Sequence, residues 1–568
     1  MFRNIIYIII TLWLHSVAFA QQHYPQNYFR SPLDIPLVLS GSFGELRSNH
    51  FHSGIDIKTQ GVTGKAVYAA ADGYVSRIKV SPYGYGNALY ITHPNGYVSV
   101  YAHLDRYNDS IAGIIKWVQY KRKSFAVDYY PAKGNIKVHK GQLIAYSGNS
   151  GSSGGPHLHF EIRKASNAHP INPFLFGISV PDHQYPRISK LAVYDYYSPV
   201  YQKRQEYPLK QSGKKVWAPG HDTIYTHESF YVGVVSIDRM DGANNKNGLY
   251  MLRFYMDSSL YFTFKADQIS FDEKRYINSY IDYEAYMDKK IKFQRTLIQA
   301  NNHLSNTRGA VNRGIFVLPD DKAHQIRVEA LDYAGQKSSL VFYVKKNRHE
   351  QPVLENANAR IFQWDHNNIY RTEHLVFSIP KGALYDNIDF SASEEENPFT
   401  PYSALYHVHK ESEPLHKYCS ISIKADSALT SDLQAKACIV SLTKNDDFYY
   451  EGGSYKDGFV STKTRSFGRY LIAVDTLAPL ITNYNVYPNK NITRQANIAF
   501  KVSDDLSGID RYDAYIDGQW VLLEYDPKKN RMFYRIDQHF PQGKHEFKIV
   551  LTDSKGNRAE RKLNLIRN

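Results

Sequence analysis

The segment PHLHFEI, residues 156–162, alternates polar and apolar side chains. Because alternate residues of an extended strand share a face, His157, His159 and Glu161 are expected on one face and the three apolar residues on the other. Two imidazoles two positions apart on a half-buried strand can reach one site together. The segment therefore predicts a β-strand whose polar face carries ligand-type side chains.

A second segment of the same kind lies upstream. In HSGIDI, residues 52–57, the same period places His52, Gly54 and Asp56 on one face and both isoleucines in a core. Gly54 is expected to leave open space between the two ligand-type side chains. A third segment, YVSVYAHL at 97–104, places Ser99, Tyr101 and His103 opposite its aliphatic residues.

Together the three segments bring ligand-type groups to one site: His52, Asp56, His103, His157 and His159. Histidine and aspartate are natural Zn²⁺ ligands, and a catalytic zinc site uses three protein ligands and keeps the fourth position for water. Three groups could hold the ion and two could manage the water. Only two cysteines are present, both distant, and no HExxH helix occurs, which excludes thiolate and helix-borne sites here.

Other histidines are expected to have ordinary roles. A lone HxH is more often a strand surface than a metal site, and His407-Val408-His409 is interpreted in that way. His93 and His139 are interpreted as turn or surface histidines. His50 could be a contact at the rim of the site, although a structural role is favoured.

The order HFHSGID (50–56), VYAHL (100–104) and GQLIAYSGNSGSSGGPHLHFEIR (141–163) resembles the lysostaphin-type (LytM-type) zinc endopeptidases of peptidoglycan. The resemblance covers about residues 37–175. It implies zinc ligation by His52, Asp56 and His159, and non-ligand catalytic roles for His103 and His157. It leaves open which of these two is the general base.

The resemblance implies an exported zinc metalloendopeptidase that hydrolyses peptide cross-links or bridges of peptidoglycan. The bond cleaved stays open between a Gly–Gly bridge and a direct D-alanyl cross-link. Two alternatives remain: a wall-binding adaptor that does not cut, and an envelope scaffold with an accessory peptidase domain. Gly148, Gly151, Gly154 and Gly155 could let a substrate chain approach closely, or could form only a flexible turn.

The composition favours a mainly β protein. The 568 residues include 47 Tyr and only 6 Met, and aromatic side chains pack well on pleated sheets. The formal net charge of +14 favours anionic partners in general. Nucleic acid is not expected, because no nucleic-acid-binding motif is found and the chain is predicted to be exported.

Five regions are expected along the chain. Residues 1–20 are interpreted as a signal peptide, since Arg3 precedes an apolar run and Ala18-Phe19-Ala20 has the form of a cleavage site. This predicts a periplasmic, envelope or secreted protein with no later membrane span. The other regions are a zinc peptidase domain at 30–185, a β-sandwich-like module at 186–346, a β-rich module at 347–477 and an Ig-like β-sandwich at 478–568.

Within the peptidase domain, an insertion at about 105–137 is interpreted as a long loop or hairpin at the rim, which leaves specificity open. The C-terminal β modules could contact other envelope proteins. Residues 324–335 resemble residues 545–556 in pattern, as expected of the last hairpin of a sandwich. Cys419 and Cys438 could form one disulfide in an oxidising compartment, but sequence spacing does not decide this.

Overall fold

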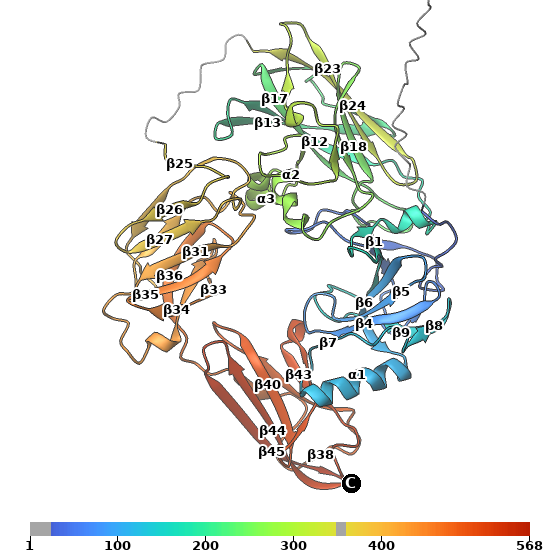
Figure 1. Ribbon diagram of the computed structural model, residues 1–568, viewed down its shortest axis with the longest axis vertical. Coiled ribbons are helices and arrows are strands. Elements are labelled where there is room, and N and C mark those ends of the chain that lie inside the picture. The colour runs from blue at the N-terminus through green and yellow to red at the C-terminus, as the bar shows by residue number, and fades with distance from the viewer. Residues whose placement is uncertain (1–23, 348–358) are drawn as a thin grey trace, which may run out of the picture.

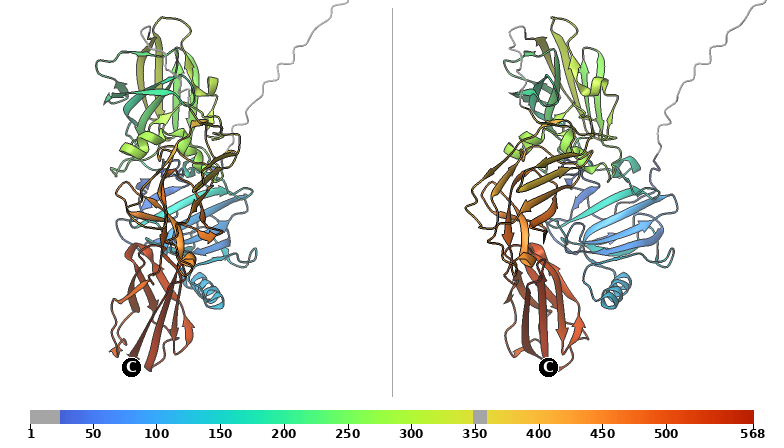
Figure 2. Two further views of the ribbon diagram at one scale, coloured as in Figure 1. Left: turned by 90° about the vertical axis from the view of Figure 1, so that its left-hand side faces the viewer. Right: turned by 60° about the vertical axis from the view of Figure 1, so that its left-hand side comes forward.

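The computed structural model describes residues 24–347 and 359–568. The expected signal peptide and the joint near Pro352 lie outside the described residues. Four β-rich units follow one another, at 24–178, 187–347, 359–475 and 480–568, and are called the first to fourth units (Figure 1). The second and fourth units lie at opposite ends of the elongated molecule (Figure 2). No helix among the described residues is long and apolar enough to cross a membrane.

The first unit is built on an antiparallel sheet with the order β1-β2-β10-β6-β5-β4-β7, to which β3, β8, β9 and β11 pair at the margins. Its strands and 3-10 helix are β1 Leu39–Gly41, β2 Ile55–Lys58, β3 Ala66–Tyr68, β4 Gly73–Val80, β5 Asn87–Thr92, β6 Tyr97–Tyr107, β7 Val127–Tyr129, β8 Lys137–Val138, β9 Leu143–Ser147, β10 His157–Lys164, β11 Pro170–Ile171 and η1 Pro173–Phe176. The central strand β10 pairs with β2 on one side and β6 on the other. This pairing brings all three segments of the sequence motif together.

The expected strand at 156–162 is confirmed, but it is not half-buried. All residues of β10 between its two ends are buried. Leu158, Phe160 and Ile162 join the core of the first unit. The polar face is covered by the second unit, where Phe271 lies against the Arg163 guanidinium. The polar side chains of this face are therefore held in place by a neighbouring unit.

The expected loop or hairpin in the insertion is wrong over much of its length. Residues Asp109–Arg122 form an α-helix, α1. The Asn108 side chain caps its N-terminus by accepting a hydrogen bond from the Ile111 N–H. Ile111, Ile115 and Val118 are buried at intervals of four and three residues, the spacing of one helix face. That face anchors the helix on the first unit.

The second unit packs a five-stranded sheet, built on β12 Arg187–Tyr196 and β17 Ser229–Ile237, against an eight-stranded sheet that contains β18 Met251–Met256, β19 Ser259–Lys265, β23 His324–Leu331 and β24 Lys337–Lys346. Two short helices, α2 Ile277–Tyr280 and α3 Tyr283–Lys289, lie at one end. Its core also takes in Phe43 and Phe51 of the first unit. The two units therefore share one core.

The third and fourth units are also paired sheets. The third contains β31 Cys419–Lys424 in one sheet and β32 Ala437–Leu442 and β36 Gly468–Val474 in the other. The fourth contains β39 Asn497–Ser503, β43 Arg531–Arg535, β44 Gly543–Asp553 and β45 Arg558–Arg567. The hairpins β23–β24 and β44–β45 are the last of their units, as the resemblance between 324–335 and 545–556 predicts.

No disulfide joins the two cysteines. Cys419 begins β31, whereas Cys438 lies in β32 of the opposite sheet, and both are buried free thiols. Burial raises the pKa of each thiol to about 12. Both side chains therefore act as small apolar groups of the core.

The fourth unit returns to the first and closes a cycle of contacts (Figure 1). Lys116 of α1 forms an ion pair with Asp537 at 2.6 Å. Tyr120 of the same helix stacks on His539 with ring centroids 4.3 Å apart. Lys528 donates hydrogen bonds to backbone carbonyls of the 149–153 loop, including that of Ser153 at 3.0 Å. The inserted helix is thus an attachment point for the C-terminal unit.

Candidate metal centre

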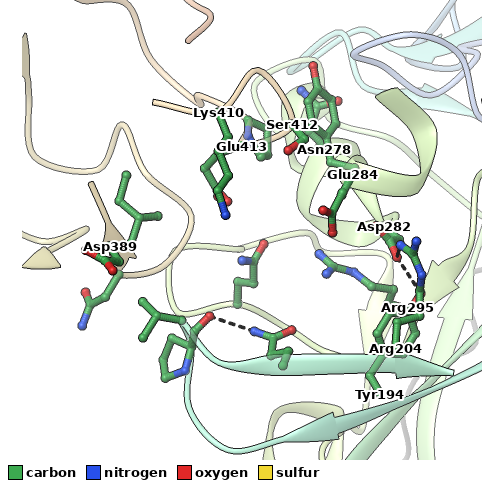
Figure 3. A pocket seen from close by; sticks show the side chains of 18 of the residues that line it. Tyr194, Arg204, Asn278, Asp282, Glu284, Arg295, Asp389, Lys410, Ser412 and Glu413 are labelled. Carbon is green, nitrogen blue, oxygen red and sulfur yellow. Dashed lines mark hydrogen bonds and ion pairs between the residues drawn. The ribbon is translucent and has the colours of Figure 1, made fainter. Parts of the chain in front are cut away.

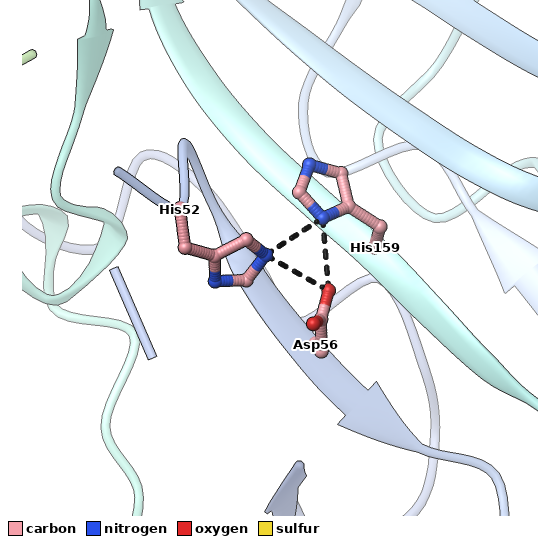
Figure 4. Close-up of side chains that lie close together, drawn as sticks. All are labelled: His52, Asp56 and His159. Carbon is pink, nitrogen blue, oxygen red and sulfur yellow. Dashed lines mark hydrogen bonds and ion pairs between the residues drawn. The ribbon is translucent and has the colours of Figure 1, made fainter. Parts of the chain in front are cut away.

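Three ligand-type atoms meet at the junction of β2 and β10 (Figure 4). His52 Nε2 lies 3.1 Å from Asp56 Oδ1 and 3.1 Å from His159 Nδ1, and His159 Nδ1 lies 2.9 Å from Asp56 Oδ1. All three residues are buried. Tetrahedral zinc with bonds of about 2.0–2.1 Å separates its ligand atoms by about 3.3 Å. The triangle fits a zinc-sized ion, and the histidine–carboxylate donor set suits zinc.

Neighbouring groups fix which ring nitrogen of each ligand histidine faces the cluster. His52 Nδ1 donates to the Ser42 carbonyl at 2.8 Å. His159 Nε2 lies 2.8 Å from Glu161 Oε1. When each ring is neutral, His52 Nε2 and His159 Nδ1 therefore point a lone pair toward the triangle. Metal binding requires such a lone pair.

Glu161 is the residue that the sequence interpretation placed on this face without assigning it a role. It is fully buried and accepts hydrogen bonds from Tyr85 Oη at 2.5 Å and Ser53 Oγ at 2.7 Å. The Arg163 guanidinium forms an ion pair with its other oxygen at 2.5 Å. Glu161 thus orients His159. The signal was its position in the same polar alternation, two residues beyond His159.

The electrostatics of the zinc-free cluster favour a cation. Burial tends to raise the pKa of Asp56, but the charge of His52 and hydrogen bonds from His157 and His159 hold it well below its usual value. Burial tends to lower the pKa of His159, yet its hydrogen bonds to Asp56 and Glu161 raise it to about 9. A proton therefore occupies the cluster of the zinc-free protein at neutral pH.

His103 reaches the cluster through a break in strand alternation. Tyr101 faces the hydrophobic core, whereas Ala102 lies opposite His159 on the site face. Regular alternation would place His103 with Tyr101, on the core side. Instead the register of β6 against β5 shifts between Tyr101 and Leu104, and His103 has φ +58°. This bulge turns the imidazole to the site, so the expected shared face of Ser99, Tyr101 and His103 is wrong.

His103 and His157 form a pair beside the triangle. Their ring centroids are 4.8 Å apart. His103 Nδ1 donates to the Ser150 carbonyl at 2.9 Å, and His157 Nδ1 to the Gly155 carbonyl at 2.9 Å. His157 Nε2 lies 3.4 Å from Asp56 Oδ1. Burial, and then the nearby His159 and His157, lower the pKa of His103 to about 3. His103 is therefore neutral at physiological pH and able to accept a proton at Nε2.

The glycines near the site have different roles. A Cβ on Gly54 would lie 2.4 Å from the Phe160 carbonyl oxygen, so Gly54 permits close approach of two strands and does not leave the expected open space. Gly148 and Gly151 likewise pack against backbone, with Gly151 at φ +68°. Gly154 and Gly155 have open space around the Cα. Close substrate approach is therefore possible only at these last two.

The other histidines stay outside the triangle. His93 is 3% exposed and bonds Ser99 Oγ and the Asp72 carbonyl, so a surface position is wrong, but its carbonyl accepts the Gly96 N–H in the turn before β6, so the expected turn position is confirmed. His139 has an exposed side chain, as expected. His407 contacts Glu395 in the third unit. His50 lines the site cavity, which agrees with a contact at its rim.

The site opens into a cavity of about 720 Å³ whose walls come from three units. The first unit supplies the five motif residues, Tyr85 and Lys79. The second unit adds Phe271, Lys274 and Arg275, and the third adds Arg465. These contributions from distant modules do not follow from the sequence, because nothing local in the chain links them to the motif.

A second cavity of about 450 Å³ lies between the second and third units (Figure 3). It is lined by charged side chains, but the Asp282 carboxylate is already bound to Arg204 at 2.7 Å and to Tyr194 Oη at 2.8 Å. No potential metal cluster among the described residues includes its lining. We interpret it as a polar joint between units.

The antiparallel sheet and its histidine–aspartate cluster define a metallopeptidase-like centre. Residues 50–116 and 125–173 match Peptidase family M23, and residues 359–475, which make up the third unit, match a Zu5-like domain. The N-terminal part of the chain thus contains a domain of the M23 type.

Relatives of known name match the same region. DD-carboxypeptidase/endopeptidase Mpg of Neisseria meningitidis serogroup B is 33% identical over 155 residues, 26% of this chain and 29% of that protein. Murein hydrolase activator NlpD of Salmonella dublin is 35% identical over 148 residues, 26% of this chain and 31% of that protein. The chain therefore spans less than a third of the length of these relatives.

Among solved structures, the lysostaphin catalytic domain of Staphylococcus simulans has 25% sequence identity. That similarity covers 24% of this chain and 92% of the other, with a TM-score of 0.19.

Proposed function

We propose that the protein is an exported zinc endopeptidase that hydrolyses peptide cross-links or bridges of bacterial peptidoglycan. The observation that carries the proposal is the buried triangle of His52, Asp56 and His159 with the imidazoles of His103 and His157 beside it. These three residues would hold Zn²⁺, which when bound supplies Lewis acidity and a water of lowered pKa.

The chain's own residues would then perform the proton transfers. His103 and His157 each have Nδ1 bonded to a backbone carbonyl, so each presents Nε2 to the cavity. One can accept a proton from the attacking water and the other can stabilise the developing oxyanion. The low pKa of His103 keeps its imidazole uncharged, and the same low pKa makes it a weak proton acceptor.

The cavity also suggests which substrates bind. Arg275 and Arg465 from two different units line it, and Arg275 Nη2 also donates to the Leu415 carbonyl at 2.8 Å. Guanidinium groups bind carboxylates well. Peptidoglycan stem peptides carry carboxylates, so an anionic peptide fits this cavity better than a neutral one.

Ligand and proton-transfer roles can be separated by substitution. His159→Ala is expected to lose both zinc and the release of soluble peptides from purified cell walls. His103→Ala and His157→Ala are expected to keep zinc and lose about 10²–10⁴-fold in turnover. Metal content and peptide release are measured on the same samples. Full zinc and full activity in His159→Ala would disprove the assignment.

A non-cutting role is the second candidate, favoured by the similarity to a protein named as a murein hydrolase activator. It predicts a zinc-loaded wild-type protein that binds cell walls but releases no peptide, with or without a chelator. Mass spectrometry of fragments from walls of known cross-link chemistry would identify the bond if cleavage occurs.

A further inference from the structure

Three aspartates gather where the chain enters the second unit. Asp182 precedes β12, Asp238 follows β17 and Asp332 follows β23. One carboxylate oxygen from each lies within 4.8 Å of the other two. Asp238 and Asp332 are only 1% and 2% exposed, and Asp182 is half-buried. This cluster is separate from the histidine site and has no role in the proposed peptidase chemistry.

The buried carboxylates are not satisfied by the protein. Asp332 Oδ1 accepts the Gln336 N–H at 2.8 Å, but Asp332 Oδ2 and Asp238 Oδ1 have no hydrogen-bond partner within 24–347 and 359–568. Asn247 pairs with Asp238 across a β-bridge, and both polar atoms of its buried side chain also lack a partner there. Buried carboxylate oxygens without donors are strongly unfavourable unless a cation or proton compensates them.

We propose that Asp182, Asp238 and Asp332 bind a calcium ion. The donors are all carboxylate oxygens, which select a hard divalent cation and not a thiolate- or imidazole-preferring metal. Calcium takes six to eight oxygen ligands in a flexible geometry. The half-buried Asp182 leaves a side from which the ion and water can enter.

The fourth unit contains a natural comparison. Asp182 stands four residues before Pro186, and Asp475 stands four residues before Pro479; Asp553 occupies the place of Asp332 in the last hairpin. Asp475, Asp504 and Asp505 also come within 4.8 Å of one another. The two clusters therefore have related positions in their units.

The cluster at the start of the fourth unit receives more hydrogen bonds from protein donors. The Asn557 amide donates to Asp553 Oδ2 at 2.7 Å and to the Asp475 carbonyl at 2.9 Å. The Ser507 N–H donates to Asp475 Oδ2 at 3.1 Å. Asp504 Oδ2 accepts the N–H groups of Gly508 at 2.6 Å and Leu506 at 3.3 Å, which leaves Asp504 Oδ1 as the one carboxylate oxygen of this cluster that is buried without a partner among the described residues. In the second unit, Gln336 takes the position of Asn557. Gln336 bonds Asp332 through its backbone N–H and not through its side-chain amide. Among the described residues, the second-unit cluster thus keeps two unpartnered buried carboxylate oxygens beside the unpartnered Asn247 amide, against one such oxygen in the fourth-unit cluster, and this difference favours the second-unit cluster as the cation site.

A bound ion would fix the joint between the first and second units. Asp182 belongs to the segment that connects them. Tyr333, next to Asp332, donates to the Phe174 carbonyl at 2.6 Å and packs on the Phe174 ring. The ion would thus link the connecting segment to a hairpin that already contacts the first unit.

Equilibrium dialysis with ⁴⁵Ca tests the proposal on the zinc-saturated mature protein, in which the histidine site is already filled. The wild type is expected to bind about one calcium per chain with a Kd between about 10 µM and 1 mM, the range of sensor and extracellular sites. Asp238→Asn is expected to lose this binding. Asp504→Asn, its counterpart in the fourth unit, is the matched control and is expected to keep it.

Thermal unfolding of the wild type provides a readout that needs no variant. Its unfolding temperature is expected to rise in about 5 mM calcium chloride, because ligand that binds only the native state stabilises it. No calcium uptake by the wild type would overturn the proposal and indicate that the carboxylates share a proton. Equal uptake by Asp238→Asn, or loss in Asp504→Asn alone, would place the site elsewhere and overturn it as well.

Discussion

At the scale of single residues, the site depends on tautomers and on one unusual backbone angle. Five imidazole or carboxylate side chains converge, but backbone carbonyls and Glu161 decide which nitrogen each histidine presents. His103 reaches the cluster only because its φ is +58°, a conformation that costs energy for a residue with a Cβ. Strain at this position is therefore tied to the proposed proton transfer.

Zinc affinity is expected to rise with pH. In the zinc-free protein the pKa of His159 is raised to about 9, so below that pH zinc must displace a proton from it. The apparent affinity should then increase about tenfold per pH unit, or about 100-fold from pH 6.5 to 8.5. Competition with a chromophoric chelator measures this. The slope should be the same in His103→Ala, which removes no ligand, and a flat profile would contradict the assignment of His159.

At the scale of elements, the segment that carries His52 is held by a neighbouring unit. Phe51 is 2% exposed and packs between Phe264, with ring centroids 5.8 Å apart, and Tyr280. Phe43, beside Ser42, is buried in the same core. The proposed ligand His52 and the Ser42 carbonyl that orients it therefore each adjoin a residue anchored in the second unit. The helix α1 likewise attaches the first unit to the fourth, through the contacts of Lys116 and Tyr120.

Phe51→Ala is expected to weaken zinc binding as well as stability. Removing a buried phenylalanine costs about 3–5 kcal/mol in the free energy of unfolding, and here the lost anchor adjoins a metal ligand. Phe500→Ala is a matched control, because Phe500 is fully buried in the fourth unit and stacks on Phe547 at 5.8 Å. Calorimetry and zinc titration of both variants should show similar destabilisation but reduced zinc affinity only in Phe51→Ala. Equal zinc affinities would show that the anchor is unimportant for the site.

At the scale of the whole molecule, the cavity exists because the units close into a cycle. Arg275 comes from the second unit and Arg465 from the third, and both line the cavity that holds the histidines of the first. Lys528 of the fourth unit fixes the 149–153 loop beside them. The C-terminal units therefore contribute to substrate binding in our proposal and are not independent appendages.

Loss of these arginines is expected to affect anionic substrates selectively. Arg275→Ala and Arg465→Ala should each raise KM about 10- to 100-fold for a cross-linked peptide with free carboxylates, since a charged hydrogen bond contributes about 1.5–3 kcal/mol. The amidated peptide should show little change, and Arg511→Ala, at an exposed site of the fourth unit, should behave as wild type. Steady-state kinetics measure both. An equal rise in KM for amidated peptide would point to a structural effect.

The sequence by itself determined which ligand-type residues the centre contains. Alternation in residues 156–162 predicts β10, and the residue types at His52, Asp56, His103, His157 and His159 predict a metal site, because strand period and ligand preference are local properties. The resemblance to the lysostaphin-type endopeptidases then implies that His52, Asp56 and His159 are its ligands. The helix α1 escaped prediction, since its buried residues Ile111, Ile115 and Val118 form a narrow stripe in an otherwise polar segment.

Only the tertiary structure decided how the cluster is completed. The bulge at His103 follows from pairing of β6 with β5 and β9, which are separate in sequence. Burial of Phe51, the arginines of the cavity and the three aspartates at the joint each need partners from distant segments. The alternation of a strand and the types of its ligand side chains are fixed within a few residues. Which unit covers a sheet face, and which group compensates a buried carboxylate, depend on packing between segments that are distant in sequence.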